Sequence, residues 1–439
     1  MKRKPYPAYK PPGVEWLGDV PEHWKVKKVR RCLLGHKQGY YSTEAYVDEG
    51  YKLLRITDLD SNGFVSLVDC PSVEIKEDAR PFLLQDNDFV FARTGGAGTF
   101  GLIRGIKDKT VFASYLIRFR FSKEADPEFL RYNFLSMQFV QAIIRNIHGG
   151  VNQNVHAEDI KEQYIPLPPF PEQKAIADFL DRETGKIDML IGKNRWLIEL
   201  LKEKRIALIS RAVTKGLDST VKMKSSSVEW LGDVPGHWEV KKIRRVATRV
   251  QTGNTPPTSE EKYYDDGTVP WFGPSSFGEG IFLSEPVKVI NECAVEDGVA
   301  RLFNAGTVML VCIGATIGKV SSIKENASCN QQITGVTFRD TLINTEFITF
   351  QLKLLETTIR EVAPSATLAI FDQNKISDLQ LALPPLPEQQ AIADFLDKET
   401  EKIDALIAKV EKAIEKLKEY RTALISAAVT GKIDVREAA

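Results

Sequence analysis

The stretch LPPFPEQKAIADFLDRETGKID, at residues 167–188, decides the fold because it recurs as LPPLPEQQAIADFLDKETEKID at residues 383–404. Over the longer segments 167–218 and 383–434, 35 of 52 positions are identical at an offset of 216. A shorter repeat precedes each segment. VEWLGDVPEHWKVKKVRR begins at Val14, and VEWLGDVPGHWEVKKIRR begins at Val228, with 15 of 18 positions identical. The chain is therefore a duplicated module, with a period far too long for a solenoid.

Each long repeat predicts one long α-helix. Pro171 and Pro387 suit a first helical turn, and no proline follows until the helix should end. Gly216 and Gly431 suit the positions just after a helix end. The expected length is about 43 residues, or roughly 64 Å.

A heptad pattern runs along both predicted helices. Its members are Leu180, Ile187, Asn194, Leu201 and Leu208 in the first copy, and Leu396, Ile403, Val410, Leu417 and Leu424 in the second. A seam sustained over four heptads requires a coiled-coil partner, and the other copy is the nearest one. Asn194 either fixes the register of this seam or points outward. An antiparallel pair would place the two modules about a pseudo-twofold axis, one at each end.

The segments between the repeats, about 32–166 and 246–382, agree poorly with each other. Both contain short apolar runs typical of strands, separated by Gly, Pro, Asn and Asp, and both end in a helical pattern. The expected strands are YKLLRITDLD, NDFVFART, SYLIRFRF, GTVMLVCIG and ITGVTFRD; the expected helices are PEFLRYNFLSMQFVQAII and NTEFITFQLKLLETTI. The fold class is therefore α+β, with two variable domains and two constant helices. Such a contrast favours different targets for the variable parts and one partner bound twice by the constant parts.

Composition excludes several classes of protein. Lys plus Arg and Asp plus Glu both number 59, so the chain of 439 residues is not polybasic. No apolar run approaches the roughly 20 residues of a membrane span, and no apolar segment follows the basic start, so we expect neither a membrane segment nor a signal peptide. The five cysteines are scattered and form no CxxC pair, which argues against a zinc site and a disulfide framework and favours the cytoplasm.

Three motifs suggest chemistry. Gly96–Gly101 is a literal GxGxxG, but a strand and turn follow where a dinucleotide site needs a helix. Gly314–Lys319 resembles a phosphate loop that is one residue short. Asp69, Glu74 and Lys76 resemble a metal-dependent nuclease motif that occurs in one half only. We expect the two glycine-rich segments to be turns at equivalent places, each with a basic residue that approaches a partner.

The short repeat carries His23 and His237, for which we expect a structural role beside tryptophan. A basic cluster follows each histidine, formed by Lys25, Lys27, Lys28, Arg30 and Arg31 in the first copy and by Lys241, Lys242, Arg244 and Arg245 in the second. Such a cluster is either a solvated face or a set of phosphate contacts, and its recurrence favours phosphate.

These repeats, together with TGNTPPTSEEKYYDDGTVPWFGPSS at 252–276, resemble the specificity subunit of type I restriction-modification systems over nearly the whole chain. The resemblance implies a non-catalytic subunit with two target-recognition domains, each of which reads one half of a bipartite, asymmetric site in double-stranded DNA. It implies that the helices space the domains and bind two modification (methyltransferase) subunits. We expect no cofactor in this chain, S-adenosylmethionine in the modification partner, and ATP and magnesium in the restriction subunits of the full complex.

The candidate DNA-contacting residues are polar or aromatic side chains of the variable segments, with Arg and Lys suited to guanine and Asn and Gln to adenine. In the first segment they are Gln38, Tyr40, Tyr41, Arg55, Thr57, Asp58, Arg93, Thr94, Asn152 and Asn154. In the second they are Thr252, Asn254, Thr255, Lys262, Tyr263, Trp271, Ser275, Thr316, Lys319, Asn330 and Gln331.

The expected domain division has four parts. They are recognition domain 1 at 1–165, spacer helix 1 at 166–218, recognition domain 2 at 219–382 and spacer helix 2 at 383–439. Two other functions stay open at this point: a stand-alone metal-dependent DNA endonuclease that uses Asp69, Glu74 and Lys76, and a coiled-coil adaptor with no nucleic-acid role. We also infer from the matched acidic and amide residues outside the seam, such as Glu172, Gln173, Glu388 and Gln389, that a second repeated partner exists.

Overall fold

The chain forms two compact units. The computed structural model describes residues 4–14, 17–41, 45–76, 78–96, 98–146, 154–362 and 370–436. Unit 1 combines Met1–Arg195 with Glu411–Ala439, and unit 2 is Trp196–Val410. Each unit therefore holds one variable segment and part of both long helices. The four-part division expected from the sequence stays a prediction.

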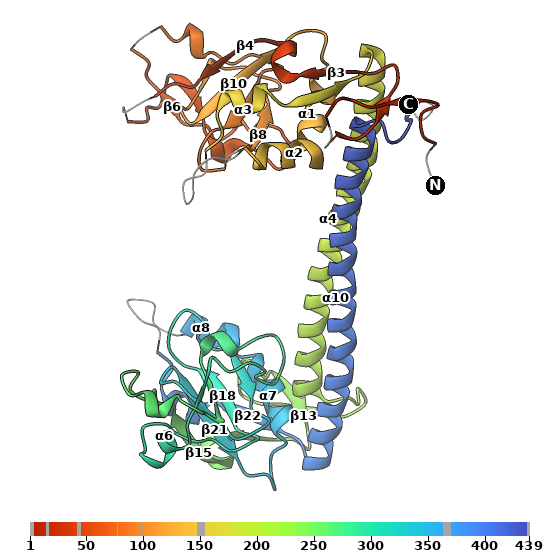
Figure 1. Cartoon of the computed structure of the whole chain (residues 1–439). Helices are drawn as coiled ribbons and strands as arrows, with labels where there is room; N and C mark the ends of the chain where they lie inside the picture. Colours follow the sequence, from red (N-terminus) through yellow and green to blue (C-terminus); the bar gives the residue numbers. More distant parts are fainter. Residues whose placement is uncertain are drawn as a thin grey trace. The chain divides into compact units, whose positions relative to one another are not determined.

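The two long helices are present as predicted. Helix α4 covers Phe170–Lys215, with 46 residues, and α10 covers Leu386–Val429, with 44 residues (Figure 1). Gly216 and Gly431 follow them with φ of +74° and +73°. This left-handed backbone costs glycine little, which explains why the helices end there.

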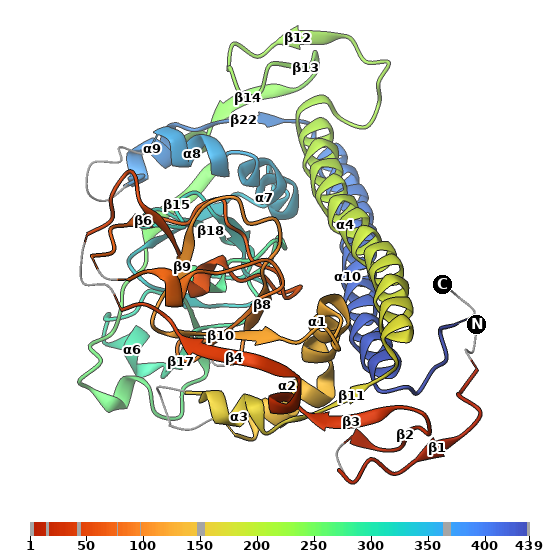
Figure 2. The ribbon, with the colours of Figure 1, turned by 90° about the horizontal axis from the view of Figure 1, so that it is seen from above.

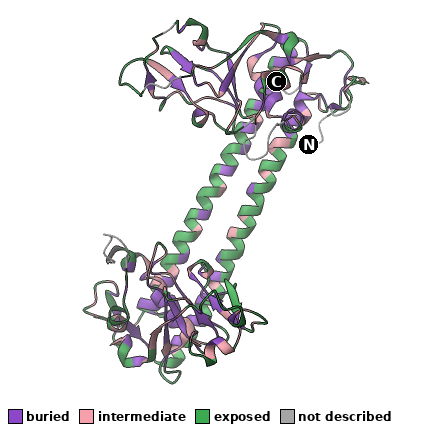
Figure 3. Cartoon of the chain, turned by 60° about the vertical axis from the view of Figure 1, so that its left-hand side comes forward, coloured by how far each residue is buried: buried purple, intermediate pink, exposed green. Residues whose placement is uncertain are grey.

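The helices pack against each other in antiparallel fashion within each unit. In unit 1, Arg421 of α10 donates to Asp188 of α4, with an Nε–Oδ1 distance of 2.9 Å. In unit 2, Arg205 of α4 lies 3.4 Å from Asp404 of α10. Residue numbers rise along α4 while they fall along α10, so the predicted antiparallel pairing is confirmed. Figure 3 shows buried residues along one side of otherwise exposed helices, and Asn194 is half-buried in α4.

The remaining elements of unit 1 precede α4. They are β1 (Tyr9–Lys10), β2 (Val20–Pro21), β3 (Lys25–Lys28), η2 (Val29–Cys32), β4 (Leu33–Gln38), β5 (Tyr51–Leu54), η3 (Ile56–Asp58), β6 (Ser72–Val73), η4 (Arg80–Phe82), β7 (Phe89–Ala92), β8 (Phe100–Leu102), β9 (Thr110–Phe112), β10 (Leu116–Phe121), α1 (Pro127–Leu135), α2 (Met137–Ile144), α3 (Ala157–Lys161) and β11 (Tyr164–Leu167).

The remaining elements of unit 2 lie between α4 and α10. They are β12 (Met223–Ser225), β13 (Asp233–Pro235), β14 (Glu239–Lys242), α5 (Ile243–Val246), β15 (Ala247–Thr252), η5 (Glu261–Tyr263), β16 (Val269–Phe272), η6 (Pro274–Ser276), β17 (Lys288–Ile290), α6 (Cys293–Glu296), β18 (Val308–Val311), β19 (Val320–Ser322), β20 (Ser328–Cys329), β21 (Ile333–Phe338), α7 (Thr345–Lys353), α8 (Glu356–Val362), α9 (Gln373–Asp378) and β22 (Gln380–Leu383).

The two units share one sheet topology despite their poor sequence agreement. The antiparallel sheet β4-β10-β7-β8 of unit 1 recurs as β15-β21-β18-β19 in unit 2. The mixed sheet β6-β5-β9 recurs as β17-β16-β20, with one antiparallel and one parallel pairing in each. The ribbons β1-β2 and β3-β11 recur as β12-β13 and β14-β22. The α+β fold and the internal repeat are therefore confirmed, and the duplication extends to segments that the sequence alone did not align.

Each predicted helix at the end of a variable segment is broken in two. In unit 1 the break lies at Ser136, whose hydroxyl accepts a hydrogen bond from the Phe139 amide and so caps α2. The same hydroxyl donates to the Asn133 carbonyl at the end of α1, at 2.6 Å. A single serine thus serves both helix ends, which a continuous apolar pattern does not reveal.

A carboxylate fastens each domain to the start of its long helix, and in unit 1 this carboxylate is buried. Glu172 accepts hydrogen bonds from Trp24 Nε1 at 3.0 Å and from the Tyr6 hydroxyl at 2.8 Å, and its other oxygen lies 2.8 Å from His23 Nε2. Figure 2 shows β3 and β11, which frame this junction, side by side near the start of α4. The structural role predicted for His23 is confirmed, because this side chain joins the short repeat to the helix.

The same junction recurs in unit 2. Glu388 lies 2.8 Å from His237 Nε2 and 3.1 Å from Trp238 Nε1. The next residue, Gln173 or Gln389, accepts from the backbone amide before α1 or α7, at 2.7 and 2.8 Å. The recurrence of these Glu and Gln residues is thus explained inside the chain, so they no longer support the inference of a second repeated partner, which stays a prediction.

Candidate nucleic-acid interface

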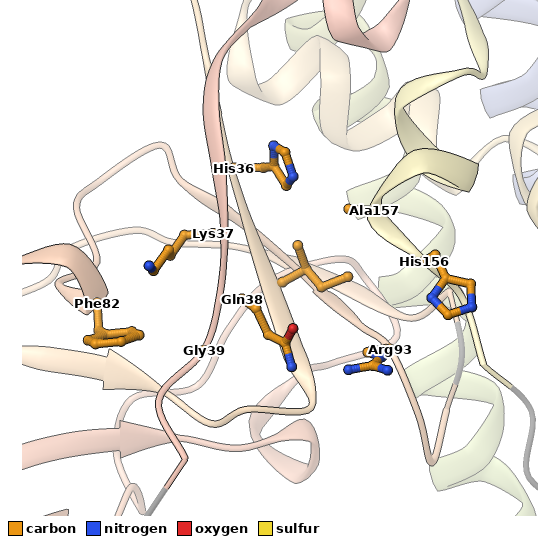
Figure 4. Close-up of a pocket in the computed structure, with 9 residues that line it drawn as sticks. His36, Lys37, Gln38, Gly39, Phe82, Arg93, His156 and Ala157 are labelled. Carbon is orange, nitrogen blue, oxygen red and sulfur yellow. The ribbon is translucent and has the colours of Figure 1, made fainter.

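A hollow of unit 1 lies beside the edge strand β4. It has a volume of about 570 Å³ and is lined by His36, Lys37, Gln38, Gly39, Phe82, Arg93, Ile117, His156 and Ala157. The lining comes from β4, the end of η4, the turn after β7, β10 and the start of α3. Figure 4 shows the side chains of Gln38, Arg93 and His156 around the same space.

Gln38 and Arg93, both predicted from the sequence, meet in this hollow. The Gln38 amide donates to the Ser114 carbonyl at 3.1 Å, which holds the end of β4 against the turn before β10. The Arg93 backbone is fixed on both sides, because its amide donates to Tyr115 and its carbonyl accepts from Val155. Arg93 Nε is buried and has no hydrogen-bond partner within the described chain. The backbone therefore holds in place a guanidinium that retains an unused donor.

Histidine and lysine add to the polar lining of the hollow. Burial, with a smaller contribution from Lys161, lowers the pKa of His36. Its ring stacks on Phe119, with centroids 5.9 Å apart. The neutral form of His36, which can both donate and accept a hydrogen bond, is therefore favoured beside the cation of Lys37.

A second hollow of unit 1, of about 350 Å³, is lined by aromatic side chains. Tyr40 and Tyr41 contribute to it together with Tyr46 and Tyr115. Tyr41 is 73% exposed, and Tyr40 packs edge-on against Phe82, with centroids 5.5 Å apart. Since Phe82 lines the hollow beside β4 and contacts Tyr40 of the second hollow, the two hollows are neighbours.

Arg55 and Asp58 are paired with each other. Asp58 is buried and accepts from the backbone amide and the guanidinium of Arg55, at 2.7 and 3.0 Å. The hydrogen bond to Asp58 raises the pKa of Arg55, and Arg55 also donates to the Asp69 carbonyl. Asp58 thus shapes the turn at η3, where Thr57 lies beside it.

Two other candidates of unit 1, Thr94 and Asn154, lie close to Arg93. Thr94 and Asn154 form an isolated antiparallel bridge that brings the segment before α3 against the turn after β7. Asn152 lies outside the described residues. The sequence therefore identified members of this site from three separate segments, but it missed His36, Lys37, Phe82 and His156.

In unit 2, Thr252 and the residues after it take the place of Gln38. The Thr252 hydroxyl lies 3.0 Å from Thr334 and accepts from Gln373 of α9 at 2.8 Å. Thr255 donates to Gln331 at 2.5 Å, and Asn330 donates to Gln332 at 3.0 Å. Asn254 Oδ1 is buried with no hydrogen-bond partner in the described part of the chain. Gln373 and Gln332 are members of this surface that the sequence analysis missed.

Four other candidates of unit 2 are already engaged within the unit. Trp271 and Tyr263 are 8% and 4% exposed and belong to a small apolar core. Lys262 pairs with Asp297 at 3.0 Å, and Lys319 donates to the Phe277 carbonyl at 3.1 Å. Ser275 lies in η6, and Thr316 lies in the turn between β18 and β19.

The recurrent basic clusters face carboxylates. Lys28 and Arg30 both pair with Glu162, at 2.6 and 2.7 Å. At the equivalent place in unit 2, Lys242 and Arg244 both pair with Asp378, at 3.1 and 2.9 Å. Their recurrence therefore has a structural explanation, and it no longer favours phosphate over an ordinary ion-paired surface.

The two glycine motifs form turns, as predicted. β8 begins at Phe100 in the first, and β19 begins directly after Lys319 in the second, so neither presents a helix N-terminus to a nucleotide. Among the described residues, no group of three or more His, Cys, Asp and Glu side chains is placed to hold a metal ion. None of the helices in the described ranges is long and apolar enough to cross a membrane.

Duplicated α+β units, each with polar side chains gathered beside the edge strand of its four-stranded sheet and each fastened to the start of a long helix, define a two-domain recognition protein. A family model described as "Type I restriction modification DNA specificity domain" matches residues 21–195 and 235–416. The chain belongs to this family, and it is a DNA specificity subunit of a type I restriction-modification system. The family is not catalytic, so the nuclease alternative is not supported.

Relatives of known name agree over different lengths. The putative type I restriction enzyme MjaX specificity subunit of Methanocaldococcus jannaschii is 24% identical over 436 residues, which is 96% of each chain. The EcoKI specificity subunit of Escherichia coli is 29% identical over 171 residues, which is 37% of each chain.

Two solved structures share the fold. One, from a study of complex assembly and conformational transition of the type I R-M system, has a TM-score of 0.69 at 18% identity and covers 93% of this chain and 98% of its own. The HsdS subunit from Thermoanaerobacter tengcongensis has a TM-score of 0.56 at 17% identity, with 94% and 98% covered.

Proposed function

We propose that each unit reads one half of a bipartite, asymmetric DNA site, unit 1 through the hollow beside β4 and unit 2 through the surface beside β15. The long helices space the two half-sites and dock two modification subunits. In this assignment S-adenosylmethionine belongs to the modification partner, and ATP and magnesium belong to the restriction partner. No cofactor is assigned to this chain.

One observation carries the proposal: the two units have the same backbone contacts around the end of the edge strand, but different side chains at the equivalent positions. We call these shared contacts the frame. Gly39 and Gly253 follow the edge strand, and an added Cβ would meet a carbonyl oxygen at 2.1 and 2.2 Å, so neither position admits another residue. The next contact is also shared. Val155 donates to the Arg93 carbonyl, and Phe371 donates to the Cys312 carbonyl, both at 2.9 Å.

The side chains on this frame differ at each equivalent position. Gln38 of unit 1 corresponds to Thr252 of unit 2, and Arg93 corresponds to Cys312. The third position is His156 in unit 1 and Asp372 in unit 2. Glutamine suits adenine and arginine suits guanine, whereas Cys312 is buried and unit 2 offers the Thr252 hydroxyl and the Asp372 carboxylate instead. One frame with two sets of side chains fits the recognition of two different half-sites.

Methylation mapping tests the proposal. We would express the full chain with its modification subunits, map the methylated bases, and then replace residues 246–382 with the matching segment of a relative. The expected result is a change in one half of the site, with the other half and the gap unchanged. A swap that altered both half-sites, or neither, would contradict independent reading.

A single substitution tests the contribution of Arg93 to the reading of the half-site. Arg93→Ala should relax the half-site that unit 1 reads by roughly tenfold, because a bidentate contact to a base contributes about 1–3 kcal/mol of discrimination. Arg360→Ala is the control in unit 2, since Arg360 is an exposed residue of α8 paired with Glu356. If the two substitutions had equal effects on discrimination, the result would contradict a contact between Arg93 and DNA.

A further inference from the structure

Two arginines of the long helices occupy equivalent positions, and each forms an ion pair with an aspartate of the other long helix, although Arg205 Nε makes no hydrogen bond to Asp404. Arg205 of α4 and Arg421 of α10 are related by the 216-residue repeat, and so are their carboxylate partners Asp404 and Asp188. Both guanidinium groups are largely buried, with side chains 10% and 16% exposed. Each arginine thus connects one long helix to the other within its own unit.

Each arginine also holds a loop of the variable domain. In unit 1, Arg421 donates to the Asn62 side-chain oxygen at 2.9 Å. In unit 2, Arg205 donates to the Glu279 carbonyl at 2.9 Å. The two loops are equivalent, because Leu102 in β8 donates to the Gly63 carbonyl and Ser322 in β19 donates to the Ile281 carbonyl. The same three-part contact, of two helices and one loop, therefore occurs twice.

Other buried cations hold the same loops. Arg131 of α1 donates to the Asn62 carbonyl at 2.9 Å and to Asp181 of α4 at 2.7 Å. In unit 2, Lys353 of α7 donates to the Gly280 carbonyl at 3.0 Å, and Lys319 donates to the Phe277 carbonyl. The loop in each unit is therefore attached by several charged donors.

The loops continue directly into segments that contain candidates for DNA contact predicted from the sequence. In unit 1, Ser66 donates to the Asp58 carbonyl across the base of the loop, next to Arg55 and Thr57. In unit 2, the loop begins at Phe277, immediately after η6, which contains Ser275. A displacement of either loop would therefore move the neighbouring recognition segment.

We propose that Arg205 and Arg421 are positioning residues that set the placement of each recognition segment relative to the helix pair. Each domain is held at the start of one long helix through Glu172 or Glu388, and its loop is held by an arginine from the other helix. The alignment of the two helices in each unit is thereby transmitted to the DNA-reading segment. This inference rests on the proposed function.

The test compares discrimination in the two half-sites. With the full chain and its modification subunits, we would measure methylation rates on the cognate site and on sites with one base changed in either half. Arg421→Gln should lower discrimination about tenfold in the half read by unit 1 only, as expected for the loss of one hydrogen bond to a charged group. Arg205→Gln should do so in the half read by unit 2 only.

Two further variants separate positioning from folding. Asn62→Ala removes the loop contact and leaves the Arg421–Asp188 pair in place, so it should reproduce the effect of Arg421→Gln. Lys202→Gln removes an exposed ion pair with Glu199 on α4 and should change neither half-site. Thermal unfolding of every variant accompanies the rates, because a purely structural arginine would lower the midpoint without affecting one half-site selectively.

The outcomes distinguish this inference from the proposed function. Unchanged discrimination in Arg421→Gln and Asn62→Ala, or an equal loss in both half-sites, would overturn the positioning role while the wild-type map still shows a bipartite site. A wild-type complex that methylates no bipartite site would overturn the proposed function itself.

Discussion

Lys353 shows how the burial of one residue changes the pH dependence of the free energy of unfolding of a whole unit. Its ammonium donates to the carbonyls of Gly280 and Val320, at 3.0 and 3.1 Å. Desolvation by burial is the largest cause that lowers its pKa, from 10.5 to about 8. The direct hydrogen-bond partners of the Lys353 ammonium are neutral carbonyl groups. They stabilise its charge less well than water does, so the ammonium releases its proton more readily.

The sign of the resulting pH dependence follows from proton binding. Below pH 8 the folded and unfolded chains both hold the proton, and Lys353 contributes no slope. Between about pH 8 and 10.5 the unfolded chain binds more protons, so the free energy of unfolding contributed by Lys353 rises with pH. The wild type should gain up to about 1.4 kcal/mol per pH unit over Lys353→Met in this window. Urea unfolding at pH 7, 8, 9 and 10 measures the difference, and parallel curves for the two proteins would contradict it.

At the scale of elements, the junction between domain and helix differs between the units in its degree of burial. The Glu172 side chain is 8% exposed, whereas that of Glu388 is 32% exposed. Only the first also accepts from a tyrosine, Tyr6, whose pKa is raised by burial and by this carboxylate. Removing the negative charge therefore leaves more donors without an acceptor in unit 1.

We predict that Glu172→Gln lowers the free energy of unfolding of unit 1 by about 1–3 kcal/mol, and that Glu388→Gln has a smaller effect on unit 2. Trp24 and Trp238 lie in the two junctions, so tryptophan fluorescence during urea unfolding reports on them. A larger loss in Glu388→Gln than in Glu172→Gln would show that burial and Tyr6 do not decide the strength of the junction.

The same scale shows what the sequence could predict. The long helices were predictable because local sequence signals define them completely: proline marks the start, glycine marks the end, and a sustained heptad marks the buried face. The split between α1 and α2 was not, because Ser136 lies within a continuous apolar run and only its two hydrogen bonds reveal the cap. Local pattern describes single elements well and the interruptions within them poorly.

The candidate site was harder to predict, for a related reason. Gln38 and Arg93 were found because their residue types suit DNA bases. His36 and His156 were missed because tertiary packing brings β4 and the start of α3 together, and no local spacing encodes that approach. In unit 2, Trp271 was a candidate for DNA contact from its residue type, and the structure shows that it lies in a small apolar core.

At the scale of the whole molecule, the repeated surface bears on the number of modification subunits. Leu190 and Leu406 are equivalent in the repeat, and both are 49% exposed. An ion pair precedes each leucine on the same helix face. Lys186 pairs with Glu183 at 2.9 Å before Leu190, and Lys402 pairs with Glu399 at 2.5 Å before Leu406. An exposed apolar residue preserved in both copies fits one kind of partner bound twice.

We therefore predict that the full chain binds two modification subunits and that Leu190→Asp or Leu406→Asp each reduces this number to one. A charge at the centre of a docking surface is costly to desolvate, whereas the same substitution on an exposed helix face changes stability by only about 0.5 kcal/mol. Leu197→Asp is the matched control, because Leu197 is 40% exposed on α4 and its equivalent in α10 is Ala413. Native mass spectrometry at saturating partner gives the stoichiometry directly. A stable one-to-one complex of the wild type would contradict the predicted number. Loss of a modification subunit in Leu197→Asp would contradict docking on the helix face that carries Leu190 and Leu406.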